Sequence, residues 1–275
     1  METEADWTID YWDALIGLEI NALTSINDTR KEWEELAKKC MTLAIKSAFL
    51  QGKDYKKETV RTAFAFLKRT MTDFRGAWLL INLGYPYQAA CIAASLYENS
   101  LLVNCLSNDE QVLKELKQSP HGDVPWGACK LAKMAAQKDV HGFISKKEPK
   151  DDKYQKAWKL SYLHYKWLCK IKHPTIQQVK DEMDTARNGA GKFVVIPYPD
   201  ARDANVGTKE MILIICISKL LSAAKNIADA QNCLDGEPKF VEFKKLAVEV
   251  YDDLKVHITK SRISDSPIKV HDFAF

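Results

Sequence analysis

Apolar residues recur at helical spacing through most of this chain. The clearest run advances in alternating steps of three and four residues, which predicts one face of a long helix packed against a second helix. Its members are Phe64, Leu67, Met71, Phe74, Trp78 and Ile81. Gly84 ends this helix and Pro86 suits the first turn of the next one. Because the turn between them is short, we expect an antiparallel helical hairpin.

The second helix of this hairpin carries one acidic residue in a predicted apolar stripe. The stripe contains Cys91, Ala94, Glu98, Leu101 or Leu102, and Cys105. A buried carboxylate is costly unless it has a partner, so Glu98 must find one. Two interpretations are open. Glu98 binds Arg75, a tyrosine or a histidine to hold the helices together, or it orients the side chain of His173.

The remaining pattern predicts further helices and no other regular element of any size. They cover residues 12–26, 33–50, 108–118 with Asn108 as cap, 125–136, 154–172 and 174–187, and two long helices around 213–227 and 240–254. Residues 138–153 and 191–208 read as loops, the second with a short extended piece at 193–196. We therefore predict an all-α fold, a single multi-helix bundle built on the long antiparallel hairpin.

The same pattern predicts one domain over residues 1–275 with four parts. These are an N-terminal helical hairpin (1–53), a core (54–188), a C-terminal helical hairpin (207–260) and a tail (261–275). Exposed aromatic residues at a terminus are unusual, so we expect the end of the tail, Phe273–Phe275, to dock on this chain or on a partner.

Composition narrows the class of protein. Hydrophobic residues make up 46% of the chain, which excludes wholesale disorder. With 40 basic and 37 acidic residues there is no general nucleic-acid signal, although a local basic patch stays possible. The seven cysteines form no C-x-x-C pair and no secretory leader precedes them, so we expect reduced core thiols in a cytoplasmic protein. The apolar run Met211–Ile217 is shorter than the ~20 residues of a membrane span, which predicts a core helix and no membrane partner.

Familiar chemical motifs are missing. The loop Asn188-Gly189-Ala190-Gly191-Lys192 has the wrong spacing for a phosphate loop, lacks the Ser or Thr after the lysine, and follows a helix, so we interpret it as a glycine helix stop. The six histidines show no metal-ligand spacing, and H-E-x-x-H and G-x-S-x-G do not occur. We expect no metal and no cofactor.

The most suggestive segment ends the predicted helix 154–172. It combines Tyr162 and Tyr165 with Lys166, Lys170 and a terminal His173 before a proline. At the N-terminus of the following helix, the dipole disfavours imidazolium, so His173 could accept a proton near pH 7. The lysines could stabilise a phosphate. The alternative is that the histidine and tyrosines are structural and the lysines form a solvated face.

Two of these stretches resemble a known superfamily. The pattern of Gly84, Tyr87-Gln88-Ala89-Ala90 and Ser95-Leu96-Tyr97-Glu98, followed by Tyr165 to His173, is similar to a bacterial all-helical family that itself resembles the HEPN superfamily (higher eukaryotes and prokaryotes nucleotide-binding). The resemblance covers roughly residues 60–178. It implies a helical bundle, often dimeric, of the kind found in RNases of toxin–antitoxin and phage-defence systems.

The resemblance also implies site residues. HEPN RNases use an arginine, four to six residues, and then a histidine, and without a metal they let the RNA 2′-hydroxyl attack the adjacent phosphate. His173 takes the histidine position, and Lys166 is the basic residue at a permitted spacing. Lysine lacks the planar fork of arginine. The family's arginine before the leucine–aromatic–glutamate stretch is also replaced, by Ala94-Ser95.

Three functions therefore stand as hypotheses. The first is a metal-independent RNase with His173 as acid or base, Lys166 as phosphate stabiliser and Glu98 as the orienting group, with Tyr162, Tyr165, Lys170 and Arg75 as binding residues. The second is a non-catalytic binding or regulatory module of a bacterial defence system, in which Glu98 and His173 are structural. The third is a small-ligand pocket lined by Trp158, Tyr162 and Tyr165. RNA, a second copy of the chain or a partner protein are the expected partners.

Overall fold

The computed structural model describes residues 11–24, 28–145, 147–173, 176, 179–180, 183 and 206–261. In these ranges all regular structure is helical and no strand occurs, which confirms the all-α prediction. The expected extended piece at 193–196, the glycine loop Asn188–Lys192 and the tail Phe273–Phe275 lie outside the described residues, as does most of the helix expected over 174–187.

The helices follow the hydrophobic periodicity closely. In chain order they are α1 (Tyr11–Thr24), α2 (Asp28–Ala48), α3 (Glu58–Leu83), α4 (Pro86–Leu106), α5 (Glu110–Lys117), α6 (Ala128–His141), α7 (Asp152–Lys172), α9 (Val206–Ala230) and α10 (Pro238–Lys260). A 3₁₀ turn, Pro120–Gly122, joins α5 to the segment before α6.

The hairpin of α3 and α4 forms as predicted. Gly84 adopts the left-handed conformation with φ 88°, which glycine reaches without steric cost. The backbone N–H groups of Gly84 and Tyr85 then donate to the carbonyl oxygens of Ile81 and Leu80, at 3.1 and 2.7 Å. Pro86 occupies the first turn of α4, where no backbone donor is needed.

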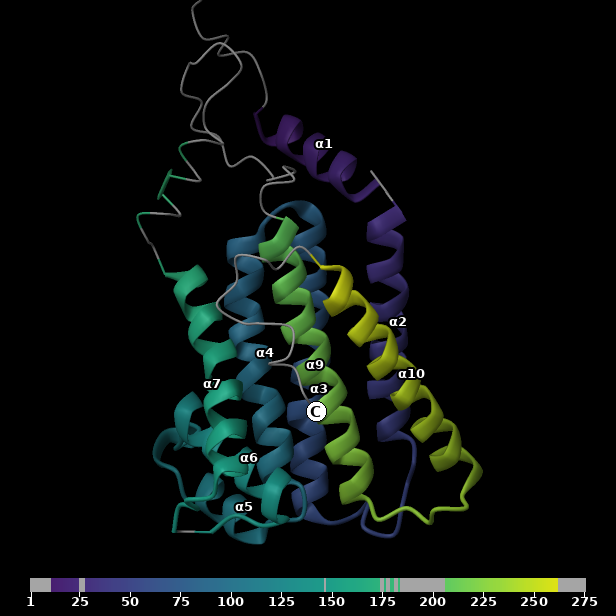
Figure 1. The fold of residues 1–275 in the computed structure, drawn as a ribbon, viewed down its shortest axis with the longest axis vertical. Coiled ribbons are helices and arrows are strands. Elements are labelled where there is room, and N and C mark those ends of the chain that lie inside the picture. Colours follow the sequence, from purple (N-terminus) through teal and green to yellow (C-terminus); the bar gives the residue numbers. More distant parts are fainter. Residues whose placement is uncertain are drawn as a thin grey trace, which may run out of the picture.

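α4 and α9 form the centre of the bundle (Figure 1). α4 packs against α3, α6, α7 and α9, and α9 packs against α2, α3, α4 and α10. α6 and α7 lie on one side of this centre and α2 and α10 on the other, while α1 packs against α3 and lies across one end. α1 therefore packs on α3, α2 packs chiefly on α9 and α10, and the consecutive helices α9 and α10 pack against each other.

The prediction of a single apolar stripe on α4 is wrong. Fifteen of its 21 residues are buried, because α3, α6, α7 and α9 pack around it and α5 contacts its end. A helix enclosed on nearly all sides needs apolar residues all round and shows no amphipathic stripe. Cys91, assigned to the stripe, is exposed, whereas Cys105 at its other end is buried.

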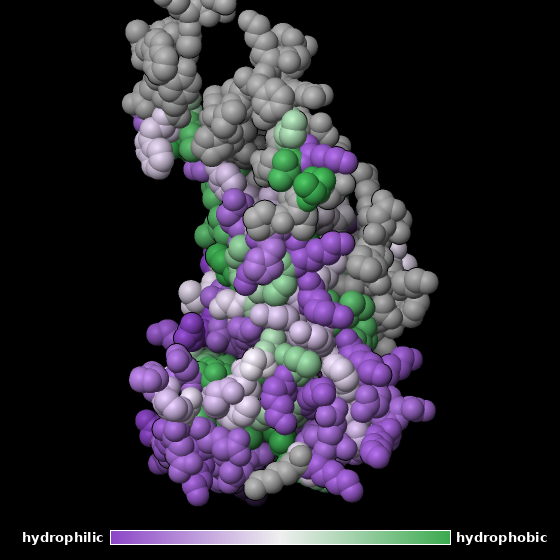
Figure 2. All heavy atoms as spheres, turned by 90° about the vertical axis from the view of Figure 1, so that its left-hand side faces the viewer, coloured by the Kyte–Doolittle hydropathy of each residue, from purple (hydrophilic) through white to green (hydrophobic). Residues whose placement is uncertain are grey.

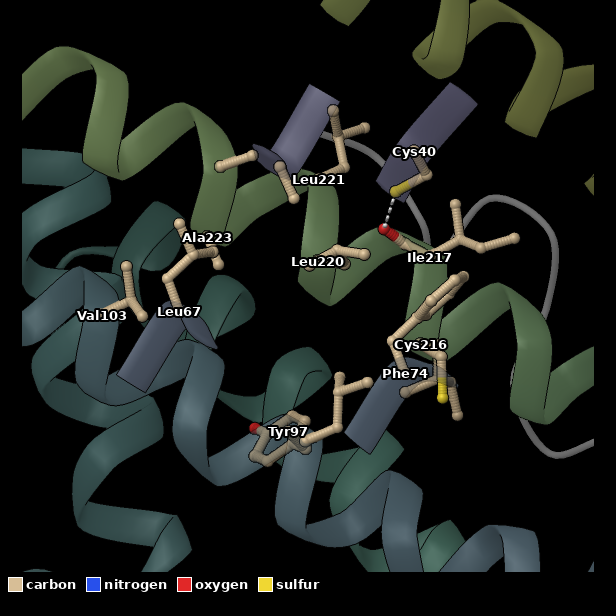
Figure 3. Close-up of a cluster of buried hydrophobic side chains, with 14 of the residues drawn as sticks. Cys40, Leu67, Phe74, Tyr97, Val103, Cys216, Ile217, Leu220, Leu221 and Ala223 are labelled. Carbon is tan, nitrogen blue, oxygen red and sulfur yellow. Dashed lines mark hydrogen bonds between the residues drawn. The ribbon is translucent and has the colours of Figure 1, made fainter. Parts of the chain in front are cut away.

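The core joins side chains of helices far apart in sequence. Figure 3 shows Cys40 of α2, Phe74 of α3, Tyr97 of α4 and Ile217 of α9 in this region, and the Cys40 thiol donates to the Ile217 carbonyl oxygen at 3.6 Å. Burial raises the pKa of the Cys40 thiol, so it stays protonated. All seven cysteines are free, but only Cys40, Cys105 and Cys216 are fully buried, so the expectation of core thiols holds for these three.

Two predicted helix boundaries are wrong, one at the start of α5 and the other at both ends of α6. Asp109, and not Asn108, caps α5 by accepting a hydrogen bond from the Val112 N–H at 3.0 Å. Asn108 has a left-handed backbone, and its amide donates to the carbonyl of Ala230. The helix expected over 125–136 begins at Ala128 and continues to His141, where Gly142 ends it in the left-handed conformation.

Candidate functional site

The outer face of α7 is the strongest local concentration of charge near the predicted site residues. Five exposed side chains share this face by helical spacing and are called here the basic face: Lys156, Lys159, Lys166, Lys170 and His173. At 1.5 Å per residue they extend over roughly 25 Å. α7 contains six lysines and one acidic residue, Asp152, in a chain whose charges are otherwise nearly balanced.

Aromatic rings lie beneath the lysines of this face. The Lys166 amine is 5.6 Å from the centre of the Tyr162 ring, and the Lys159 amine is 5.8 Å from that of Trp158. Lys133 of α6 approaches the Trp158 ring at 4.7 Å and so adds a charge beside α7. Such cation–π contacts hold each amine along the helix surface. Figure 2 looks onto this side of the molecule, where hydrophilic side chains are spread along its height.

His173 and Lys166 lie on one face without touching. His173 is exposed at the C-terminal end of α7, where its backbone N–H donates to the Cys169 carbonyl at 3.1 Å. Seven residues, about 10 Å of helix axis, separate it from Lys166, and Lys170 lies between them. The three groups can therefore contact one short stretch of a single nucleic-acid strand.

Glu98 finds its partner in Tyr165. Burial first, and then hydrogen bonds to Glu98 and Cys169, raise the pKa of the Tyr165 hydroxyl. His173 lies eight residues beyond Tyr165, about 12 Å further along α7. Glu98 therefore interacts with a tyrosine, which is one of the partners expected if Glu98 holds the helices together. His173 lies further along α7 and does not contact Glu98. Arg75 is exposed on α3.

Two of the aromatic residues proposed to line a small-ligand pocket, Tyr162 and Tyr165, pack against each other. The rings of Tyr162 and Tyr165 stack with centroids 6.1 Å apart and planes at 18°. The Tyr97 ring lies 5.3 Å from Tyr165, and Trp158 donates to the Gln155 side chain at 3.2 Å. Tyr97, Tyr162 and Tyr165 therefore form one aromatic cluster, and Trp158 contacts Gln155 and two lysine side chains instead.

A polar cluster between α4, α7 and α9 was missed at the sequence level. The Lys219 amine donates to the Ser161 hydroxyl at 3.0 Å, and the Tyr97 and Ser161 hydroxyls are 2.8 Å apart. The same amine lies 4.8 Å from the centre of the Tyr97 ring. The signal available in the sequence was Lys219 itself, two residues after the most apolar run of the chain.

The environment of this cluster disfavours positive charge. Burial lowers the pKa of Lys219 to about 8, and the nearby Asp139 carboxylate opposes that shift. Burial, assisted by Lys219, lowers the pKa of His164 to about 3, so this imidazole is neutral at pH 7. Burial raises the pKa of Asp139, whose carboxylate accepts a hydrogen bond from the Asn104 amide at 2.8 Å.

Other buried polar groups have structural roles. The Lys138 amine donates to the carbonyl oxygens of Asn104, Cys105 and Ser107 at the end of α4, where the helix dipole favours a cation. Asp73 of α3 accepts hydrogen bonds from Ser95 and Asn99 of α4, both at 2.9 Å. Within the described ranges, no three His, Cys, Asp or Glu side chains are placed to hold a metal ion.

Two of the described helices, α4 and α9, are long and apolar enough to cross a membrane by length and composition. In each, 78% of the apolar window is buried within the bundle, so helix packing already accounts for its apolar character.

Comparison of the chain with protein-family models, curated proteins and solved structures finds no match. The likeness to the HEPN superfamily therefore stays a prediction from the motifs around Glu98 and His173.

Proposed function

We propose that this protein is a HEPN-like, RNA-binding helical module of a bacterial defence or toxin–antitoxin system, acting in the cytoplasm. The observation that supports this proposal is the basic face of α7, with five exposed basic side chains over roughly 25 Å and no acidic side chain among them. A row of cations at this scale matches a phosphate backbone. Aromatic rings between the lysines suit single strands, whose bases stack on them.

A pair of charge-matched variants tests RNA binding. The basic-face variant combines Lys159→Gln, Lys166→Gln and Lys170→Gln. The control removes three exposed lysines of α10 by Lys239→Gln, Lys245→Gln and Lys255→Gln. Both lose three charges, so a non-specific charge effect is equal in the two.

Binding is measured by fluorescence anisotropy with a labelled single-stranded RNA over a range of salt concentrations. Three lost phosphate contacts reduce the slope of log K against log salt by roughly 2. We expect this change and at least tenfold weaker binding in the basic-face variant alone. Equal losses in both variants, or none in either, contradict the proposal.

Cleavage of RNA is the second candidate, favoured by the placement of His173 and Lys166 on one exposed face. In this reaction His173 takes the proton of a 2′-hydroxyl whose oxygen attacks the adjacent phosphorus. Lys166 stabilises the negative charge on the phosphate oxygens. The bond from phosphorus to the 5′-oxygen breaks, and that oxygen takes the proton from His173. The product carries a 2′,3′-cyclic phosphate.

The cleavage test uses total RNA or tRNA with chelator present. We expect the parent to cleave and His173→Asn to be inactive, while His121→Asn, at another exposed histidine, keeps the parent activity. Binding without cleavage by any of the three proteins leaves the non-catalytic module, with His173 and Glu98 as structural residues.

We also propose a homodimer or a complex with a partner protein, which light scattering of the purified protein tests.

A further inference from the structure

We propose that Ser161 and Lys219 form a nucleophile–base pair that takes up acyl groups from small carboxylic esters. The pair lies inside the bundle between α7 and α9, and the proposal does not depend on RNA binding. Its geometric basis is the 3.0 Å contact between the Lys219 amine and the Ser161 hydroxyl oxygen. A serine becomes nucleophilic when a base within 2.6–3.2 Å removes its proton.

Lys219 is suited to act as that base. An ordinary lysine is charged at pH 7 and cannot accept a proton, but burial brings the pKa of this one to about 8. The groups that face the amine are Tyr97 of α4, Asp139 of α6 and His164 of α7. Asp139 and the face of the Tyr97 ring favour the ammonium form, whereas burial opposes it more strongly, so a useful fraction of neutral amine exists near pH 8.

Tyr97 of α4 contacts the Ser161 hydroxyl and helps to orient it. Its side chain is fully buried, and burial raises the pKa of its hydroxyl, so the hydroxyl remains neutral and able to donate. When Lys219 is neutral, Ser161 donates to the amine and Tyr97 donates to the Ser161 oxygen, 2.8 Å away. Tyr97 is a positioning residue that holds the serine hydroxyl toward Lys219.

The reaction balances without a further reagent. The Ser161 oxygen attacks the ester carbonyl carbon and its proton passes to the Lys219 amine. The carbon–oxygen bond to the leaving alcohol breaks, and that oxygen takes the proton back from Lys219. Water then attacks the acyl-serine with Lys219 again as base, which releases the carboxylic acid and restores Ser161.

Access limits the substrate to small molecules. Ser161 and Lys219 are half-buried residues, whereas Tyr97 and His164 behind them are buried. The surrounding rings of Tyr97, Tyr162 and Tyr165 offer an apolar environment. We therefore infer an ester with a short acyl group and an uncharged leaving group.

The test uses an alkyl fluorophosphonate, in which a base-activated serine forms an oxygen–phosphorus bond while fluoride leaves. Labelling of the full chain is followed by intact mass and the site is mapped by peptide mass spectrometry. We expect one label on Ser161, formed at a rate that rises with pH around a midpoint near 8. Para-nitrophenyl acetate should be hydrolysed with the same pH dependence.

Three variants separate chemistry from structure. Ser161→Ala should abolish the label, and Lys219→Arg, which keeps the cation but accepts no proton, should slow it by about 100-fold and remove the pH midpoint. Ser222→Ala, at a half-buried serine of α9 one turn from Lys219, should label like the parent. Circular dichroism confirms that each variant is folded. An unlabelled parent, a label on another residue, or a Lys219→Arg variant that labels at the parent rate overturns the proposal.

Discussion

The loop between α2 and α3 is closed so tightly that one added methyl group should destabilise the whole bundle. A Cβ atom on Gly52 would lie 2.3 Å from the carbonyl oxygen of Gln231 and 2.7 Å from the Cys233 sulfur, at the end of α9. Contacts below 3.0 Å force one of the two backbones to move. We therefore expect Gly52→Ala to separate this loop from α9.

The hydrogen bonds of Gln231 set the cost of that movement. Its carbonyl accepts from the Asp54 N–H at 3.0 Å, its side-chain oxygen accepts from the Gln51 N–H at 3.0 Å, and its amide donates to the Ser47 carbonyl at 2.6 Å. Overpacking costs about 1–3 kcal/mol, and each broken bond adds about 1 kcal/mol. A total of roughly 3 kcal/mol lowers the melting temperature by roughly 6–12 °C in a protein of this size.

Thermal unfolding followed by far-ultraviolet circular dichroism measures this effect. The matched control is Gly236→Ala in the loop before α10, because a Cβ there meets nothing within 4 Å. The control should melt close to the parent temperature. If Gly52→Ala melts with the control, the loop yields to the methyl group at no cost and the reasoning is refuted.

Two further predictions concern buried basic groups. The pKa of His164 is about 6.5 in the unfolded chain and about 3 in the folded protein, so acid favours the unfolded state. The free energy of unfolding should be complete above pH 6.5 and about 2 kcal/mol lower at pH 5. Urea unfolding above pH 6.5 and at pH 5 should show that His164→Asn lacks most of this loss. Lys138→Met should lower the free energy of unfolding in urea by about 1–3 kcal/mol, because the carbonyl oxygens at the end of α4 lose their donor. The control Lys130→Met, at an exposed position of α6, should lower it by almost nothing. Equal losses in the two variants would contradict the capping role of Lys138.

Helix positions were predictable where periodicity is strong and ends are marked by glycine or proline. The α3–α4 hairpin with Gly84 and Pro86, and α7 with its end at His173, follow from such local signals. The start of α5 was assigned to Asn108 although Asp109 caps it. Neighbouring polar residues can each serve as a cap, and the choice depends on which one a distant helix engages, here through the Asn108 contact with Ala230.

Candidate site residues were predictable as residue types but not as partners. Glu98 needed a polar partner, and a tyrosine was among those expected, yet which tyrosine depends on how α7 lies against α4. The exposure of Lys166, Lys170 and His173 on one face follows from helical spacing once α7 packs by its other side. The Ser161–Lys219 contact has no local signal, since 58 residues separate the two.

By itself, the sequence determined that this protein is helical, where most helices lie, and which residues could carry chemistry, because these properties depend on interactions within a few turns. Only the tertiary structure decided that α4 and α9 are enclosed by the other helices, that Glu98 binds Tyr165 and not His173, and that Lys219 meets Ser161 beside Tyr97. The physical reason is burial. The partner and the protonation state of a carboxylate, an amine or a hydroxyl depend on the groups that packing brings against it. The spacing of residues along one helix does not predict which groups those are.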